Sequence, residues 1–199
     1  MSVEDTYFDS LFKGNDDPWA MRDRWYEQRK RALLMACLPR RQYRSVFEPG
    51  CANGETSAEL AGRCAALLCS DTAAAAVALT RQRLQGQPHV RVEHGRQPQQ
   101  WPAGTFDLIV LNELCYYLDS AALDELIERA LASLSADGQL LACHWRAPIE
   151  GCELDAEQVH RRLRHKLPMT HLLQHEEPDF LLDLFSRDPL SVAQHEGLA

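Results

Sequence analysis

The run from Glu48 to Gly54 has the residue types and the position of a ligand-binding turn. It has the sequence Glu-Pro-Gly-Cys-Ala-Asn-Gly and lies between a short β-rich segment, residues 45–48, and a helix-forming segment, residues 56–64. In an open α/β sheet, ligands bind at such a turn. Glycine permits backbone angles closed to other residues and lets a ligand approach the main chain. The start of the following helix offers free N–H groups to a carboxylate.

The composition of this turn argues against a dinucleotide ligand. In the fingerprint G-x-G-x-x-G, Ala52 stands in place of the second glycine, Gly54 comes one residue early, and Glu55 takes the place of the third glycine. A carboxylate at the helix start would repel a pyrophosphate. Glu48, two residues before Gly50, can instead accept hydrogen bonds from an ammonium group such as that of a methionine moiety. The turn therefore favours a positively charged ligand without phosphate.

A second acidic residue completes the predicted crevice. Asp71 follows a short strand, residues 67–70, and comes 21 residues after Gly50, close to the ~20 expected of an acid that binds ribose hydroxyls. Asp is also favoured as the N-cap of a helix, here the one beginning near Ala73. With Glu48 on the neighbouring strand, we favour the ribose role.

The sequence resembles the class I S-adenosylmethionine-dependent methyltransferases, and more closely the NodS-like group. The resemblance covers about residues 19–141 and is carried by Glu48-Pro49-Gly50-Cys51, by Phe106-Asp107-Leu108-Ile109-Val110 and by Glu113-Leu114-Cys115-Tyr116-Tyr117-Leu118. It implies an α/β, Rossmann-like, mostly parallel seven-stranded sheet with an antiparallel last strand and helices on both faces. It also implies S-adenosyl-L-methionine as the cofactor.

The resemblance distributes the cofactor over several segments. It assigns Glu48, Gly50 and Gly54 to the methionine part and Asp71 to the ribose. The neighbouring residues Cys51, Ala52 and Thr72 are expected in the same site.

The adenine end departs from the family pattern. Many relatives carry an Asp after the third strand that accepts a hydrogen bond from the adenine amino group, whereas this chain has Arg96 and Gln97 in that stretch. Arg cannot accept a hydrogen bond, so we expect main-chain groups or the Gln97 side chain to bind adenine. Trp19, Tyr26 and Arg29 resemble the family segment that folds over the cofactor. The alternative for the two aromatic residues is plain core packing.

Candidate acceptor residues follow the fourth and fifth predicted strands. Methyl transfer requires mainly alignment of nucleophile, methyl group and sulfur, and an amine acceptor must also lose a proton. Glu113 could bind or deprotonate an ammonium group, Tyr117 could contact a sugar or a cation, and His144 could take a proton. The alternatives are a turn cap for Glu113, half-buried packing for Tyr117 and a satisfied strand-end histidine for His144.

Hydrophobic spacing predicts the elements that must position these residues. We expect lead-in helices over 18–38, then alternating strands and helices, which implies parallel strands, with residues 106–111 as a central strand. The short link between the last two strands predicts an antiparallel pair. The expected strands are 45–48, 67–70, 90–93, 106–111, 139–143, 170–175 and 180–186, and the expected helices are 56–64, 73–84, 121–134 and 155–166.

One domain, residues 1–199, accommodates these elements. We divide it into the lead-in helices over the cofactor site (1–44), the cofactor-binding core (45–145), and the acceptor-side helix with the final strand pair (146–199).

Charge and composition limit the partners. The formal net charge of −8 disfavours nucleic acid, whose backbone is bound through Lys and Arg. No apolar stretch approaches the ~20 residues that span a bilayer, and the acidic N-terminus lacks the pattern of a secretory signal, so we expect a cytoplasmic protein.

Seven Cys without a C-x-x-C pair indicate buried thiols and no metal site. The oligomeric state stays open.

The sequence thus predicts methylation of a small-molecule acceptor. The NodS resemblance implies N-methylation of an amino sugar in a deacetylated oligosaccharide. The alternatives are methylation of another small amine or hydroxyl compound, an NAD-dependent oxidoreductase, and a cofactor-binding protein without catalytic activity.

Overall fold

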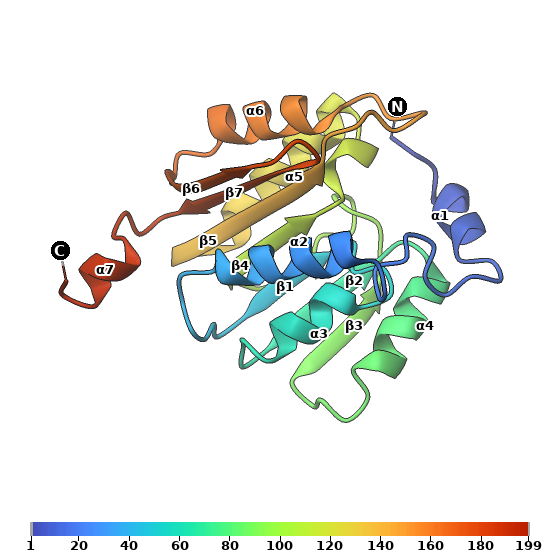
Figure 1. Cartoon of the computed structure of the whole chain (residues 1–199), viewed down its shortest axis with the longest axis horizontal. Helices are drawn as coiled ribbons and strands as arrows, with labels where there is room; N and C mark the ends of the chain where they lie inside the picture. The colour runs from blue at the N-terminus through green and yellow to red at the C-terminus, as the bar shows by residue number, and fades with distance from the viewer. Residues whose placement is uncertain (1, 199) are drawn as a thin grey trace.

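A seven-stranded sheet with helices on both faces forms the body of the molecule (Figure 1). The computed structural model describes residues 2–198. The strands are β1 (Val46–Pro49), β2 (Leu67–Asp71), β3 (Val90–His94), β4 (Phe106–Asn112), β5 (Leu134–Trp145), β6 (Thr170–Glu176) and β7 (Phe180–Ser186). The helices are α1 (Asp5–Leu11), α2 (Trp25–Ala36), α3 (Glu55–Ala61), α4 (Ala74–Arg83), the 3-10 helix η1 (Cys115–Tyr117), α5 (Ser120–Ser133), α6 (Ala156–Lys166) and α7 (Val192–His195).

The strand order β3-β2-β1-β4-β5-β7-β6 confirms the predicted fold class. Strands β1 to β5 pair in parallel, and β7 runs antiparallel to both β5 and β6. The strand order reverses direction between β1 and β4, so that the turns after these two strands diverge to opposite faces. A crevice opens at such a point, at the carboxyl ends of the strands.

The central strand β4 separates two hydrophobic cores. Leu108 and Val110 pack with residues of α2 and α3 on one face, whereas Ile109 and Leu111 pack with residues of α5 and α6 on the other. Figure 1 shows α2, α3 and α4 in front of the sheet and α5 behind it. Because alternate side chains of a strand point to opposite faces, one apolar run fills both cores, as predicted for this strand.

Several predicted boundaries are wrong. The lead-in helix begins at Trp25 and not near residue 18, because the Asp17 carboxylate accepts hydrogen bonds from the backbone N–H groups of Met21 and Arg22 and holds this stretch in a turn. The helix α5 ends at Ser133, and β5 begins directly at Leu134 and not at residue 139. The short helices α1 and α7 were not predicted, since each is only one or two turns long.

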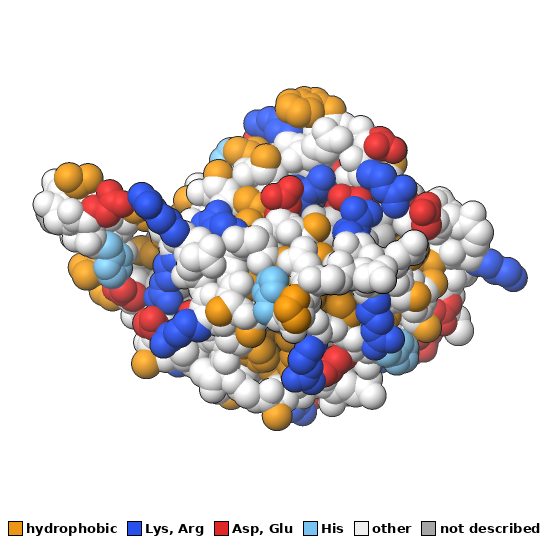
Figure 2. Space-filling view, turned by 90° about the horizontal axis from the view of Figure 1, so that it is seen from below, with side chains coloured by type: hydrophobic (Ala, Val, Ile, Leu, Met, Phe, Trp, Pro, Cys, Tyr) orange, Lys and Arg blue, Asp and Glu red, His pale blue; other side chains and the backbone are white. Residues whose placement is uncertain are grey.

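The charged side chains do not form a patch of one sign on the face seen in Figure 2, where basic and acidic groups are interspersed. The segment around α7 projects from the body in both views. Within residues 2–198, no helix is both long and apolar enough to cross a membrane.

Candidate functional site

A cavity of about 520 Å³ opens at the carboxyl edge of the sheet, where the turns after β1 and β4 diverge. It brings together most of the residues singled out in the sequence. Those that line it are Trp19, Tyr26, Gly50, Ala52, Asp71, Thr72, Arg96, Gln97, Glu113 and Tyr117. The remaining ones, which lie outside its lining, are Arg29, Glu48, Cys51, Gly54 and His144.

The turn after β1 adopts left-handed backbone conformations. Gly50 has a φ of +74°, and a Cβ atom there would lie 3.2 Å from Leu114 Cδ1. Ala52 has a φ of +48°, a region that costs a non-glycine residue about 1–2 kcal/mol. Its N–H donates to Asp71 Oδ2 at 2.9 Å, and its carbonyl accepts from Thr80 Oγ1 at 2.8 Å. These two hydrogen bonds hold an alanine in the conformation that glycine would favour.

Asp71 contacts the start of α4 and lines the cavity, although the N-cap of α4 is Ala73 and not Asp71. Its Oδ1 accepts from the Ala73 N–H at 2.9 Å, at the start of α4, while the side chain also lines the cavity. The residue is 9% exposed, and burial raises the pKa of its carboxyl. One carboxylate therefore organises the Ala52 turn and still faces the ligand space.

Glu48 lies beneath the turn. It is 2% exposed and accepts hydrogen bonds from Ser57 Oγ and, at 3.7 Å, from Cys69 Sγ. Burial raises its pKa to about 7. A buried carboxyl at the underside of the turn can act on a ligand through its charge.

Cys51 and Gly54 shape the turn from the same side. The Cys51 thiol lies 3.7 Å from Thr80 Oγ1. Gly54 has a φ of +80°, and a Cβ there would approach Thr80 side-chain atoms to 3.0 Å. Gly54 is thus required for the close approach of α3 and α4, a packing reason that the sequence motif did not reveal.

The end of the cavity predicted to bind adenine contains an unpaired acceptor. Gln97 is 7% exposed, and its Nε2 donates to the Gln100 carbonyl at 3.2 Å. Its Oε1 is buried without a hydrogen-bond partner among the described residues. A buried acceptor without a donor is costly, and the residue that carries it is one of those lining the cavity.

Arg96 holds the N-terminal segment against the cavity. Its guanidinium donates to Asp5 Oδ1 in α1 and, at 3.1 Å, to the Val3 carbonyl. The Val3 N–H in turn donates to the Tyr117 carbonyl at 2.9 Å, and the rings of Phe8 and Tyr117 meet edge to face at 4.9 Å. Tyr117 is therefore an aromatic wall shared by the segment after β4 and the N-terminal segment.

The end of the cavity next to α2 and the turn after β4 is organised around a buried cation that the sequence did not reveal. Lys30 is 5% exposed and donates to Glu113 Oε1 at 2.7 Å. Its Nζ also lies 3.0 Å from Glu27 Oε2 and 5.0 Å from the centre of the Tyr26 ring. Burial opposes the charge of Lys30, but the carboxylates of Glu113 and Glu27 outweigh it and keep the pKa of Lys30 above its ordinary value. The spacing of Glu27 and Lys30, three residues apart on α2, was the available signal.

Glu113 is fully engaged by donors. Besides Lys30, it receives hydrogen bonds on Oε2 from the Tyr116 hydroxyl and, at 2.9 Å, from the Trp145 N–H. Its backbone φ of +53° is left-handed, which turns the side chain back toward β5 and α2. The residue predicted to bind or deprotonate the acceptor is thus held by three neighbours.

His144 lies in a buried chain of side chains. It is 0% exposed, and its Nε2 accepts from the Cys115 N–H at 3.2 Å. Its Nδ1 lies 3.0 Å from His160 Nε2, and His160 Nδ1 lies 2.7 Å from Asp183 Oδ2. Burial lowers the pKa of His144 well below its ordinary value. A neutral histidine that holds the η1 backbone matches the alternative of a satisfied strand-end histidine.

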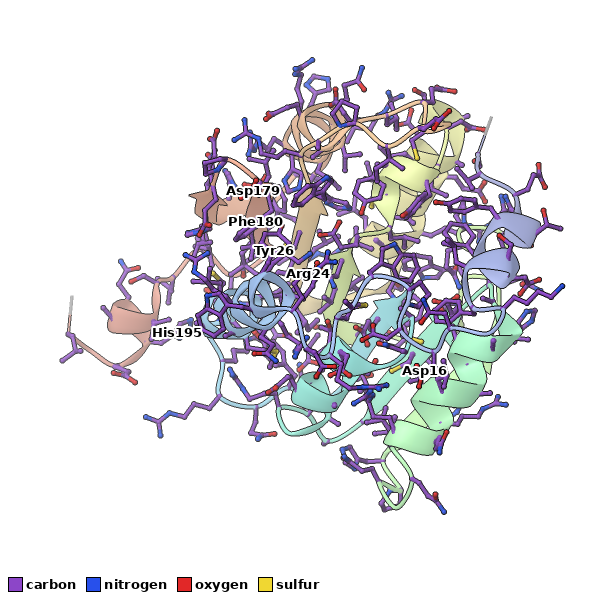
Figure 3. All side chains as sticks on the ribbon, turned by 45° about the vertical axis from the view of Figure 1, so that its right-hand side comes forward. Asp16, Arg24, Tyr26, Asp179, Phe180 and His195 are labelled. Carbon is purple, nitrogen blue, oxygen red and sulfur yellow. The ribbon has the colours of Figure 1, made fainter. Side chains whose placement is uncertain are left out.

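Arg29 and Tyr26, both on α2, lie in different surroundings. Arg29 forms a two-bond ion pair with Glu177 at 2.7 and 2.8 Å, outside the cavity lining. Tyr26 lies at the start of α2, near Phe180 (Figure 3), with 6.3 Å between ring centres, and meets Trp145 edge to face at 5.3 Å.

Comparison with known sequences places the site in a family context. Residues 10–164 match the family model described as Nodulation protein S (NodS). Nodulation protein S of Sinorhizobium fredii is 30% identical over 128 residues, which are 63% of this chain and 59% of that protein. The Rhizobium tropici protein of the same name is 30% identical over 128 residues, 63% of this chain and 54% of that protein. The match therefore spans less than two thirds of the length of these relatives.

Solved structures are similar over more of the chain. N-methyltransferase NodS from Bradyrhizobium japonicum, in complex with S-adenosyl-L-homocysteine, is 28% identical with a TM-score of 0.80, covering 92% of this chain and 98% of that one. A candidate methyltransferase from Pseudomonas syringae is 60% identical with a TM-score of 0.74, covering 82% of this chain and 99% of that one.

Replacing Asp183 should destabilise the protein. Its carboxylate is 0% exposed; burial alone would raise its pKa, but hydrogen bonds from His160 and Arg164 lower it to about 2. A lowered pKa stabilises the fold above pH ~4, and this contribution is lost as the pH falls toward 2. Asp183→Asn should lower the unfolding free energy at pH 7 by about 3–5 kcal/mol and weaken its dependence on pH between 4 and 2.

Urea denaturation over this pH range measures both effects. Asp179→Asn, which alters an exposed carboxylate in the turn before β7, is the control and should leave the stability unchanged. Equal stability of the two variants would contradict a stabilising role for the buried hydrogen bonds of Asp183.

Removing the Asp71 carboxylate should weaken binding of S-adenosylhomocysteine. Asp71→Ala should reduce the affinity at least tenfold, since a hydrogen bond to a charged group contributes about 1.5–3 kcal/mol. Calorimetric titration measures the loss. Thr80→Val leaves Asp71 in place, removes the other hydrogen bond of the Ala52 turn and the contact with the Cys51 thiol, and should cost less affinity. An affinity of Asp71→Ala equal to that of the unaltered protein would remove Asp71 from the ligand site.

Proposed function

Because the chain belongs to the NodS family, we propose that it transfers the methyl group of S-adenosyl-L-methionine to the amine of an amino sugar in a deacetylated oligosaccharide. One observation carries the proposal: a single cavity at the β1/β4 crevice has groups suited to a nucleoside at one end and a net negative acceptor site at the other. The complex described above, NodS from Bradyrhizobium japonicum, contains S-adenosyl-L-homocysteine.

The cofactor end fits a charged nucleoside. Asp71 would accept hydrogen bonds from the ribose hydroxyls, and the unpaired Oε1 of Gln97 would accept one from the adenine amino group. The left-handed turn at Gly50 and Ala52 leaves room for the methionine part. Glu48, buried below with a raised pKa, would interact with its ammonium group. When bound, the cofactor supplies an electrophilic methyl group on a sulfonium.

The acceptor end favours an amine over a hydroxyl compound. Lys30 between Glu27 and Glu113 gives this cluster one negative charge in excess, which attracts an ammonium group. The aromatic rings of Tyr117 and Trp145 line the same space and suit the apolar face of a sugar or a cation.

The dinucleotide alternative is not supported. Glu55 forms ion pairs with Arg83 at 2.5 Å and Arg22 at 3.6 Å and does not line the cavity, so its charge is not available to repel a ligand as the sequence suggested. Family membership, and not this charge, argues against NAD.

A transfer assay with labelled S-adenosylmethionine tests the function. We expect label in a tetramer of glucosamine and none in the fully N-acetylated tetramer, since acetylation removes the nucleophilic lone pair. Transfer to hydroxyl compounds only would support O-methylation. Tighter binding of NADH than of S-adenosylhomocysteine in calorimetric titration would overturn the proposal, and cofactor binding without transfer to any acceptor would favour the non-catalytic alternative.

The pH dependence of cofactor binding tests the role of Glu48. If its ionised form interacts with the ligand ammonium, affinity for S-adenosylhomocysteine should rise as the pH passes 7, by about tenfold between pH 6 and 8. Glu48→Gln should bind with an affinity that does not change over this range. Titrations of both proteins at the two pH values decide, and an equal rise in both would exclude Glu48 as its origin.

A further inference from the structure

We propose that Glu27, and not Glu113, binds the ammonium group of the acceptor and takes its proton before methyl transfer. The inference rests on the proposed function and names the base that an amine acceptor requires. The two carboxylates share Lys30 and line the same cavity, but their surroundings differ.

Glu113 has little remaining capacity to act as a base. Lys30 occupies its Oε1, and the Tyr116 hydroxyl and the Trp145 N–H occupy its Oε2. To accept a proton from a ligand, either oxygen would have to give up one of these hydrogen bonds. Glu113 therefore fixes the segment after β4 and gives Lys30 a partner.

Glu27 retains a free oxygen. Lys30 lies 3.0 Å from its Oε2, and no described residue donates a hydrogen bond to its Oε1. The side chain is 12% exposed and lines the main cavity. An ammonium group in that cavity can therefore reach one oxygen of Glu27 without displacing a protein donor.

The position of Glu27 also fits a role next to the reacting atoms. It follows Tyr26, which Figure 3 labels, on the first turn of α2. A second, small cavity of about 10 Å³ is lined by Glu27, Lys30, Thr56 and Asn112, so Glu27 lies close to the carboxyl end of β4. The cofactor turn at Gly50 lies beside this strand end and lines the main cavity with Glu27.

The proton balance of the reaction requires such a group. The acceptor R–NH₃⁺ gives a proton to Glu27 and becomes R–NH₂, whose lone pair forms the N–C bond to the methyl group while the S–C bond breaks. The products are R–NH₂–CH₃⁺ and neutral S-adenosylhomocysteine, and protonated Glu27 returns its proton to solvent. Lys30 stays paired with Glu113 throughout.

Steady-state kinetics with S-adenosylmethionine and a glucosamine tetramer test the proposal. Glu27→Gln should lower kcat about 100-fold, the lower range for general acid–base catalysis, with affinity for S-adenosylhomocysteine within twofold of the unaltered protein. Raising the pH from 7 to 9 should restore part of this loss, because more acceptor amine is then neutral in solution. Glu27→Asp should keep intermediate activity. The charged residues that line the two cavities together with Glu27 are Lys30, Glu113, Arg24, Arg31, Asp5, Asp71 and Arg96, and all are retained.

Two control variants, Asp23→Asn and Glu113→Gln, and the unaltered protein complete the test. Asp23→Asn, in the exposed turn before α2, should keep full activity. Three results would overturn the role of Glu27 while leaving the methyl-transfer proposal standing. The first is a near-normal kcat of Glu27→Gln, and the second is a loss of cofactor affinity in Glu27→Gln that parallels its loss of kcat. The third is a loss of kcat that high pH restores in Glu113→Gln but not in Glu27→Gln. An unaltered protein that binds S-adenosylhomocysteine but methylates no amine would overturn both.

Discussion

The ion pairs of Lys30 connect the lead-in helix to the sheet. An ammonium group that is 5% exposed must be paired, because an isolated buried charge costs several kcal/mol. Its partners come from two elements: Glu27 from α2 itself and Glu113 from the turn after β4. This requirement fixes where α2 lies over the carboxyl edge of the sheet. The placement of Tyr26 against Trp145 follows from it.

The two ends of the cavity are built by different physical means. At the cofactor end the backbone dominates: left-handed conformations at Gly50 and Ala52, held by hydrogen bonds to Asp71 and Thr80, create the space. At the acceptor end buried charges dominate, and the left-handed backbone of Glu113 serves to direct a carboxylate. Backbone geometry suits a ligand of constant shape, and charge suits recognition of a small reacting group.

Local signals were sufficient for the fold and for the turn after β1 that lines the cavity, and insufficient for the buried cluster around Lys30. The βα rhythm, Asp71 and the turn from Glu48 to Gly54 are local in sequence, and the family resemblance they supported is confirmed by the match over residues 10–164. The bond between Lys30 and Glu113 joins residues 83 positions apart, so no pattern in either segment revealed it. The same reason explains why His144 was considered for chemistry, since its burial against His160 depends on α6.

The N-terminal segment makes the two ends interdependent. It bonds to Arg96 beside the adenine end through Asp5 and Val3, and to the backbone of Tyr117 at the acceptor end through the same Val3. Arg96, expected to contact the cofactor, thus also anchors an N-terminal segment that lines the cavity. Because this one short segment forms hydrogen bonds with both loops, a displacement of either loop must break its contacts with the segment or move the segment with it. The position of Tyr117 therefore depends in part on Arg96, a residue that the sequence assigned only to the cofactor.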